Sequence, residues 1–332
     1  MKIVKPSFEI IPYTEPKDAL KKIEVVGRTC YKSEDKITDS SCETFVAGII
    51  KRTHEAVLEH FAFIFEMDDK SYNILRLMLD RLEDCGFNSF LRVTYDRRPI
   101  VSGNVRAWRD IFKFCKARYT LIPCFMMDFV MANPILFPEF SEDDFDKDNV
   151  SLFKQITVGD LYEGVEYLTH TDITVRLIND RGVSHEEGRH RVASFAQEST
   201  RYCNYSKDKF GNEVTYIDLL GGMRLDPKMS SLPAEAFGAI YDEWIAACED
   251  AEQHYNKMIE LGASPQIARS VLNNSTKTEI CVTLNIAGWL HFFSLRCSPA
   301  AHPQIRENAI PLLDYFKKNI SDVFDSIEVN AA

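Results

Sequence analysis

Residues 172–201 read DITVRLINDRGVSHEEGRHRVASFAQESTR, a stretch that joins a strand pattern to a dense group of cationic side chains. Apolar residues alternate over 172–178, which is typical of a strand with one buried face. A helical pattern resumes near Arg181 and is predicted to continue through the arginines that follow. A strand and a helix in succession at the centre of the chain indicate a fold of mixed α and β structure.

The last part of this stretch, residues 189–201, combines three arginines and a histidine with serine and threonine hydroxyls. Arginine forks bind phosphate oxygens in pairs, and hydroxyls add donors at short range. Because the formal net charge of the chain is −11, a long polyanion such as nucleic acid would be repelled by the rest of the surface. The run therefore indicates a binding site for an anionic small molecule. The alternative is a solvated face on which the arginines pair with neighbouring carboxylates at small benefit.

The composition is that of a soluble globular protein. The chain has 332 residues, of which 45% are apolar and 27% charged, enough for one large domain or two small ones. No window approaches the roughly eighteen apolar residues of a membrane span, and Pro6 and Glu9 interrupt any signal-peptide core. The nine cysteines form no C-x-x-C pair, which favours free thiols in a reducing compartment. We therefore expect a cytoplasmic protein that binds neither nucleic acid nor a membrane.

Helical periodicity flanks the central stretch on both sides. On the N-terminal side it predicts helices over 15–31, from residue 40 or 41 past residue 50, over 71–83 and over 105–119, with a β-rich run at 61–66. On the C-terminal side it predicts helices over 234–261, 265–273, 285–296 and 303–323, after a short strand at 214–217. The sequence thus predicts an α+β fold in which an antiparallel sheet packs with a helical bundle and the C-terminal half is helical.

We expect a single domain that spans the whole chain, with an insertion or small subdomain at about 84–165. This region is interrupted by glycines and prolines, and within it Trp108, Ile111 and Phe112 are predicted to form a buried helical stripe. Its acidic stretch at 139–148 is most simply a solvated loop. No chemistry is assigned to the insertion.

Two histidine pairs are candidate metal ligands. Residues 54–60 read HEAVLEH, with the histidines six apart, and His185 and His190 lie five apart. A helical zinc site needs histidines at i and i+4 so that both side chains share one face. At about 3.6 residues per turn these pairs point to different sides, so no metal site is predicted.

Asn285 and Arg296 lie eleven residues apart on a predicted helix, which brings them to nearly the same direction. Trp289 and Phe292 stand between them. A polar–aromatic–polar stripe of this kind suits the wall of a pocket for a planar ring. The alternative is a core helix with a polar residue at each end, and the spacing alone leaves both interpretations open.

The spacing R-H-R-x-x-S-x-x-x-x-S-x-R within 189–201 resembles the signature of the flavin-dependent thymidylate synthases, with every fixed position present. Residues 54–60 are similar to the family's H-E-x-x-x-E-H segment, which precedes a strand. Residues 285–296 resemble its N-A-R…N/H-F-L…L-R helix. Arg269 matches its A-R-x-x-L-P step.

This resemblance, which covers roughly residues 10–70 and 165–325, implies an enzyme that makes dTMP from dUMP. Methylenetetrahydrofolate would be the carbon donor and NADPH the reductant, through FAD, in a homotetramer with active sites between subunits. The chemical difficulty is that C5 of uracil is a weak nucleophile. Arg296 is the candidate catalytic residue in place of a cysteine nucleophile, because a fixed cation beside the ring draws charge toward its carbonyls. FAD carries the redox chemistry and the protein orients it.

The resemblance also implies which residues form the site. Those implied to bind dUMP are Glu186, Arg189, Gln197, Glu198, Ser199, Arg201, Arg269 and Arg296. Those implied to bind FAD are Cys30, His54, Glu59, Arg189, His190, Arg191, Asn285, His291 and His302. Either Gln197 or Glu198 contacts the nucleotide, and Cys30 lies near the flavin phosphates or is a buried core thiol. Ala287 replaces an arginine of the family, and His302 follows Arg296 by six residues where the family has four.

Other classes of protein compete with this interpretation. A cysteine-dependent thymidylate synthase would use a nucleophile such as Cys124, which has no nearby His or Gln partner in the sequence. A nucleotide- or RNA-binding module would use the arginines without chemistry, and it would be expected to have a basic surface. The absence of G-x-G-x-x-G and of a P-loop disfavours a Rossmann dehydrogenase and a kinase.

Overall fold

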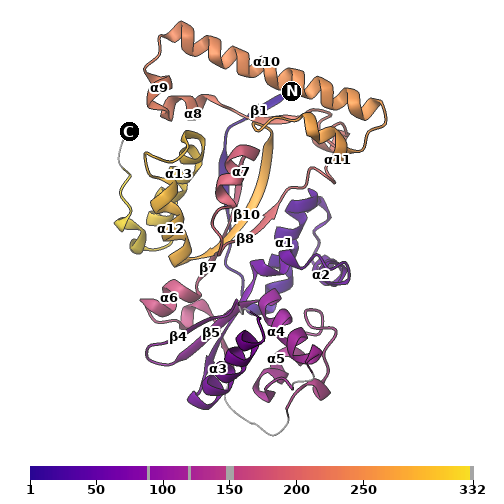
Figure 1. The fold of residues 1–332 in the computed structure, drawn as a ribbon, viewed down its shortest axis with the longest axis vertical. Helices are drawn as coiled ribbons and strands as arrows, with labels where there is room; N and C mark the ends of the chain where they lie inside the picture. Colours follow the sequence, from indigo (N-terminus) through magenta and orange to yellow (C-terminus); the bar gives the residue numbers. More distant parts are fainter. Residues whose placement is uncertain (88–89, 119–120, 147–152, 330–332) are drawn as a thin grey trace.

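The computed structural model describes residues 1–87, 90–118, 121–146 and 153–329. Mostly antiparallel sheets pack against helices, which confirms the predicted α+β class. Figure 1 shows an elongated molecule in which α10 (Ala234–Glu260) crosses one end and α3 (Asp69–Asp84) lies near the other. A central sheet stands between these ends, with helices on both sides of it.

The central sheet holds the strands β2 (Ser7–Ile11), β7 (Asp172–Asp180), β10 (Lys277–Asn285) and β8 (Ser194–Gln197), in that order. Every neighbouring pair in it is antiparallel. β10 pairs with β7 over its whole length, and β8 pairs along the other edge of β10. β10 is therefore hydrogen-bonded on both sides, at the interior of the sheet.

Helices cover both faces of this sheet. On one face, apolar residues of β10 such as Leu284 share a core with α12 (Ile286–Arg296) and α13 (Pro303–Asn319). On the other face, Cys281 belongs to the core that includes α1 (Ala19–Tyr31). Figure 1 shows α1 and the α12–α13 pair on opposite sides of β10. Because successive side chains of a strand point to opposite faces, alternate residues of β10 serve two separate cores.

A second sheet orders the strands β4 (Arg92–Tyr95), β5 (Pro99–Asn104), β3 (Ala62–Met67) and β6 (Phe153–Ile156). The region predicted as an insertion supplies β4, β5, β6 and α4 (Val105–Ala117), and it therefore builds a sheet around β3. The predicted stripe of α4 is confirmed, since Trp108, Ile111 and Phe112 are each 0% exposed. These side chains belong to the same core as α1, so the region packs continuously against the N-terminal helices.

The prediction of a solvated loop for the acidic stretch 139–148 is confirmed only in part over its described residues. Ser141, Glu142 and Asp143 are exposed, but other residues of the stretch pack against the protein. Glu139 forms an ion pair with the buried Arg109 at 2.5 Å. Phe145 is 2% exposed. Aromatic side chains between the acidic ones are buried and fix the stretch to the protein. The prediction considered only the charges and did not take these aromatic residues into account. Residues 147 and 148 lie outside the described part of the chain.

The remaining elements surround the two sheets. A short parallel pair joins β1 (Lys2–Val4) to β9 (Thr215–Ile217), which confirms the strand predicted at 214–217. The other helices are α2 (Ser41–Lys51), α5 (Met127–Met131), α6 (Val165–His170), α7 (Arg181–Glu187), α8 (Leu220–Leu225), α9 (Pro227–Ser230) and α11 (Pro265–Ala268). Across the described residues, no helix combines the length and apolar character needed to cross a membrane.

Most of the predicted helices are confirmed, several with shifted ends. The helix predicted over 105–119 ends at Ala117, and Tyr119 lies outside the described residues. The helix predicted over 265–273 is divided into α11 and a 3₁₀ turn at Arg269–Val271. The helix predicted over 303–323 ends at Asn319.

Two predictions of secondary structure are wrong. The last third of the chain is not wholly helical, because β10 occupies it over Lys277–Asn285. Both faces of this strand are buried, with Ile280, Val282 and Leu284 in one core and Cys281 in the other. The arginine-rich run is not helical either: α7 ends at Glu187, turns occupy 188–193, and β8 follows. Pairing of β8 with β10 overrides the local helical preference.

The contact between α1 and α2 allows a test of this packing. An added Cβ at Gly27 would lie 2.7 Å from a ring atom of Phe45 and 3.0 Å from Val57. We expect Gly27→Ala to lower the free energy of unfolding by about 1–3 kcal/mol, because the ring must move. The control is Gly238→Ala in α10, where nothing lies within 4 Å and alanine should add about 0.5–1 kcal/mol. Urea unfolding followed by circular dichroism measures both, and equal midpoints would contradict the packing.

Candidate active site

Arg296, at the C-terminal end of α12, is held by residues from α7 and the turn that follows it. Its Nε donates to Nε2 of His190 at 3.0 Å. Its two terminal nitrogens donate to Glu186, one to Oε2 at 2.8 Å and the other to the backbone carbonyl at 2.7 Å. The side chain is 12% exposed, so the guanidinium is fixed in orientation and still reachable from solvent. We call Arg296, Glu186, His190 and the neighbouring His291 the Arg296 cluster.

His190 is neutral in this cluster. Its ring centroid lies 4.9 Å from that of Phe292 and 5.8 Å from that of His291. Burial, followed by the positive charge of Arg296 and the proximity of His291, lowers the pKa of His190 to about 4. Because Nε2 accepts a hydrogen bond from Arg296, the hydrogen of the neutral ring lies on Nδ1.

Glu187, the last residue of α7, is buried close to the cluster. Asn179 donates to its Oε1 at 2.6 Å, and its Oε2 has no hydrogen-bond partner among the described residues. Burial is the largest cause that raises the pKa of Glu187 to about 8, opposed by the bond from Asn179 and assisted by Asp180. Arg296 also lowers this pKa, so the two side chains sense each other's charge. Near neutral pH the carboxyl is therefore mostly protonated.

Asp180 connects this neighbourhood to the start of α13. Its Oδ1 accepts from the backbone N–H of Val183 at 2.7 Å, and its Oδ2 accepts from Gln304 at 2.6 Å. His302 caps α13 by accepting from the N–H of Gln304 at 3.3 Å. Burial raises the pKa of Asp180, whereas the Val183 N–H and then the exposed His302 lower it. The sequence-predicted His302 thus lies at a helix cap beside Asp180.

A second polar group surrounds the start of β10, and we call it the Lys277 network. Nζ of Lys277 pairs with Glu198 at 3.0 Å and with Glu279 at 2.5 Å. Tyr205 donates to the other oxygen of Glu198 at 3.0 Å, and Lys32 pairs with Glu279 at 2.9 Å. Glu198 is 3% exposed, so both of its oxygens are engaged inside the chain.

Gln197, the other candidate for the nucleotide contact, points away from this network. Its Nε2 donates to Ser184 at 3.0 Å and to Thr278 at 3.1 Å. Ser184 belongs to α7, so the amide of Gln197 lies on the α7 side of the sheet. The choice between Gln197 and Glu198 stays a prediction.

The end of the arginine-rich run lies beside the C-terminal end of α1. The N–H of Ser199 donates to the carbonyl of Cys30 at 3.0 Å, and its Oγ accepts from the N–H of Arg201 at 3.3 Å. Arg269 donates to Oγ1 of Thr200 at 2.9 Å. Arg201 and Arg269 are both exposed, so their guanidinium groups are accessible to an anion. The Cys30 thiol is half-buried, and burial raises its pKa to about 12.

Three of the residues expected to bind FAD line one cavity of about 380 Å³, which we call the Arg191 cavity. They are Glu59, Arg191 and Asn285. Arg92, Arg106, Asp110 and Asp172 add further charges to its walls, and Val192 and Leu284 add apolar surface. The cavity is therefore bounded by elements of both sheets and by the arginine-rich run.

The other residues expected to bind FAD do not line this cavity. His54 is exposed, and its Nδ1 shares a hydrogen bond of 2.9 Å with the hydroxyl of Tyr31. Arg189 is exposed, and Ala287 is exposed without lining the cavity. Within one chain, most of the sequence-predicted residues thus fall into three places: the Arg296 cluster, the Lys277 network with the adjoining end of the run, and the Arg191 cavity.

Of the two interpretations left open for the stripe from Asn285 to Arg296, the structure favours the core helix. Asn285 is not inside the helix but caps it, accepting from the N–H of Gly288 at 2.8 Å. Trp289 and Phe292 are 0% and 1% exposed in the core. α12 is thus a core helix with a polar residue at each end, and those residues reach two different parts of the site.

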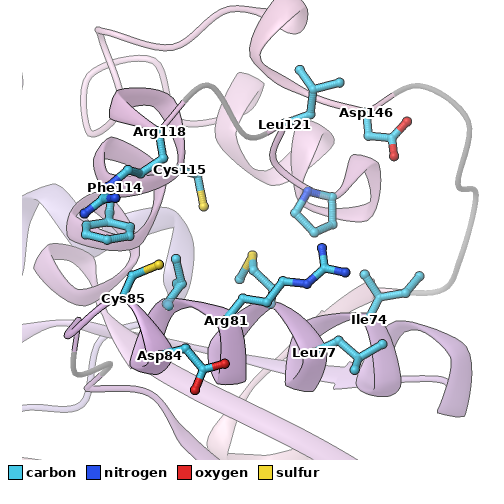
Figure 2. A pocket seen from close by; sticks show the side chains of 13 residues that line it. Ile74, Leu77, Arg81, Asp84, Cys85, Phe114, Cys115, Arg118, Leu121 and Asp146 are labelled. Carbon is cyan, nitrogen blue, oxygen red and sulfur yellow. The ribbon is translucent and has the colours of Figure 1, made fainter.

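A larger cavity of about 580 Å³ lies between α3 and α4, and none of the predicted site residues lines it. Figure 2 shows its walls, with Leu77 and Arg81 on α3 and Phe114 and Cys115 on α4. Its lining is mainly apolar, and we assign it no chemistry. Among the described residues, no three His, Cys, Asp or Glu side chains gather as a metal site would require.

Sequence reasoning missed residues that organise these groups. Lys32, Lys277 and Glu279 belong to no motif. Lys277 and Glu279 are neighbours on β10, and Lys32 reaches Glu279 because α1 packs on this strand. Glu187 differs from its neighbour Glu186 only in the direction of its side chain at the end of α7. Predicting a strand over 277–285 would have revealed Lys277 and Glu279, because it places these two charged residues at the start of a buried strand.

Comparison with known proteins places this chain beside one enzyme family. The sequence model of the family described as "Thymidylate synthase complementing protein" matches residues 148–320. This range contains the arginine-rich run, the Lys277 network apart from Lys32, and α12. It excludes α4 and the strands that precede it.

Individual relatives carry the name flavin-dependent thymidylate synthase. One from Geobacter sulfurreducens is 32% identical over 144 residues, which cover 43% of this chain and 55% of the relative. One from Corynebacterium efficiens is 32% identical over 167 residues, or 49% of this chain and 64% of the relative. One from Pyrococcus abyssi is 27% identical over 184 residues, or 54% and 69%. The chain thus spans between half and two thirds of the length of the first relatives that it matches.

Glu187 gives the stability a defined pH dependence. Its pKa of about 8 in the folded protein lies above the ordinary 4.5, so the folded state holds a proton that the unfolded state releases in this window. Stability from this group is therefore complete below about pH 4.5 and declines by up to about 1.4 kcal/mol per pH unit as the pH rises to about 8. Glu187→Gln keeps the neutral form, so we expect it to exceed the wild type in thermal stability at pH 8 and to match it near pH 4.5.

Differential scanning calorimetry between pH 4.5 and 8.5 measures this difference. Glu260→Gln in α10, where the glutamate side chain is 66% exposed, is the control and should follow the wild-type profile. Parallel Tm profiles for Glu187→Gln and the wild type would rule out the buried proton.

Proposed function

Since the chain belongs to the thymidylate synthase complementing protein family, whose model matches residues 148–320, we propose that it is a flavin-dependent thymidylate synthase. The proposed reaction converts dUMP to dTMP, with methylenetetrahydrofolate as carbon donor and NADPH as reductant through FAD. Its role would be de novo synthesis of dTMP. The relatives are named flavin-dependent thymidylate synthases, and we propose the same activity for this protein as a whole.

The contact between Arg296 and His190 carries this proposal. These residues belong to two separate motifs, 106 positions apart in the chain, and their side chains meet at 3.0 Å. Glu186 adds two further bonds to the same guanidinium. An arginine on a solvated face is usually free to move, whereas a catalytic cation must be held in a fixed orientation. The bonds from Arg296 to the neutral histidine and to the two oxygens of Glu186 hold it in this way.

The task proposed for Arg296 is to make C5 of uracil nucleophilic enough to react. A cation fixed beside the pyrimidine draws electron density toward the ring carbonyls and stabilises the negative charge that develops there. The guanidinium is mostly withdrawn from water, which strengthens its field. His190 holds the cation without adding a second positive charge beside it. When bound, FAD supplies the hydride that completes the methyl group.

The proposed binding site for the dUMP phosphate is the end of the arginine-rich run. Arg201 and Arg269 are exposed there, and Ser199 lies between them and α1. Two guanidinium forks with a hydroxyl match the acceptor oxygens of a phosphate dianion. Glu186, Arg189 and one of the pair Gln197 and Glu198 are the further proposed contacts to the nucleotide.

The Arg191 cavity fits part of an FAD molecule. Arg191 offers a cation, Asn285 an amide and Glu59 a carboxylate, and apolar residues complete the walls. Most of the residues that line the cavity are charged or polar, which suits a polar part of the cofactor such as its phosphates. Cys30, His54, Arg189, His190, His291 and His302 are the further proposed contacts, and they lie outside the cavity.

We also propose a cytoplasmic homotetramer with sites shared between subunits, and the division of the predicted residues supports the sharing. In one chain most of the residues proposed for dUMP and FAD occupy three places. A second copy of the chain, set against these surfaces, would close them around both ligands and exclude water from the reaction.

Arg296→Ala separates catalysis from cofactor binding. We expect the variant to bind FAD within about threefold of the wild-type Kd and to lose dTMP formation by about 100-fold or more, because the electrostatic stabilisation of the ring is removed. Flavin absorbance measures the first and chromatography of dTMP the second. Arg224→Ala, an exposed arginine of α8, is the control with full activity expected. Normal turnover by Arg296→Ala would remove Arg296 from its role.

Cys124→Ala tests whether a cysteine nucleophile is used. Cys124 lies in a 3₁₀ turn before α5, and neither it nor its turn belongs to the three groups described above. We expect Cys124→Ala to retain dTMP formation within about twofold of the wild type, since no covalent step needs this thiol. Chromatography of dTMP measures the activity of the variant. An inactive but folded variant would instead support a cysteine-dependent mechanism.

A further inference from the structure

We propose that Arg106, in the first turn of α4, is a phosphate-binding residue of the cofactor site. The inference rests on the proposed function, because it takes FAD as the ligand of the Arg191 cavity. Arg106 belongs to no motif, and it precedes the matched range of residues 148–320. If it binds FAD, the region predicted as an insertion takes part in the site.

Arg106 lies on the wall of the Arg191 cavity. It lines the cavity from α4, while Arg191 and Ser194 line it from the arginine-rich run. Ala107 and Asp110 place the first turns of α4 along the same wall. The cavity is thus built jointly by the motif and by the region between β5 and α5, and a ligand inside it contacts both.

The three arginines of the cavity differ in how accessible they are to a ligand. Arg92 is not accessible, because it is locked to both oxygens of Asp172 at 2.5 and 2.7 Å. Its side chain is also only 23% exposed. The Arg106 side chain is 43% exposed, and Arg191 is exposed as well. Two accessible guanidinium groups on one cavity form a site for phosphate oxygens, which such forks bind in pairs.

Two carboxylates hold the Arg106 side chain. Its Nη1 donates to Oε1 of Glu59 at 2.6 Å, and its Nε lies 3.4 Å from Oδ2 of Asp110. Both pairs are partly exposed, so each stabilises the free protein little, and Nη2 of Arg106 takes part in neither of them. The carboxylates therefore position the guanidinium at the cavity. Glu59 would thus contribute to cofactor binding by holding Arg106, without a direct contact to the flavin.

The experiment compares two flavins with the full-length protein. FAD carries phosphates and riboflavin carries none, and quenching of flavin fluorescence measures the Kd of each. We expect Arg106→Gln to weaken FAD binding about tenfold or more and to leave riboflavin binding within about twofold, because only phosphate contacts are lost. Arg106→Lys keeps the charge without the fork and should fall between. Arg118→Gln, at the other end of α4, is the control and should match the wild type for both flavins.

The outcomes separate the two proposals. Wild-type protein that binds no FAD overturns the proposed function and this inference with it. Wild-type binding of FAD with an unchanged Kd in Arg106→Gln and Arg106→Lys overturns the inference alone. Equal losses for FAD and riboflavin also overturn it, since they would indicate a distorted cavity instead of a missing phosphate contact. Unchanged thermal unfolding of Arg106→Gln shows that any loss of affinity comes from the folded protein.

Discussion

Burial of β10 on both faces is the constraint on which the rest of the structure depends. The strand is hydrogen-bonded to β7 over its full length and to β8 along its other edge. Every residue from Thr278 to Leu284 is buried, and alternate side chains enter two different cores. A shift of register by one residue would exchange these two sets of side chains, so the position of every residue on β10 is strongly specified.

This strand and the helix that follows it place all three parts of the site. Lys277 begins β10 and gathers the carboxylates of the Lys277 network. Asn285 ends β10, caps α12 and lines the Arg191 cavity. α12 then carries Arg296 to His190. Because one continuous strand and helix connects these points, the distances between them follow from regular backbone geometry, and the flanking turns supply the other partners.

Secondary structure was predicted best from the sequence where one face of an element is buried and the other is exposed to solvent. The stripe of Trp108, Ile111 and Phe112 on α4 is an example, since its periodicity records the burial directly. The sequence pattern missed β10, a strand that is buried on both faces and flanked in the sequence by helical patterns. It also predicted a helix for the arginine-rich run, whose second half pairs with β10 as β8. In the acidic stretch, buried Phe145 was hidden among charged neighbours.

By itself, the sequence determined the α+β class, the amphipathic helices and the motif residues from Arg189 to Arg201, because these depend on residue type and on spacing along the chain. Only the tertiary structure decided which residues meet. It brought Arg296 to His190, and it gave Arg106 from α4 a place on the same cavity as Arg191. It also enclosed Glu187 and raised its pKa. The physical reason is that these contacts join positions far apart in the chain, and their geometry and desolvation arise only when the sheets and helices pack.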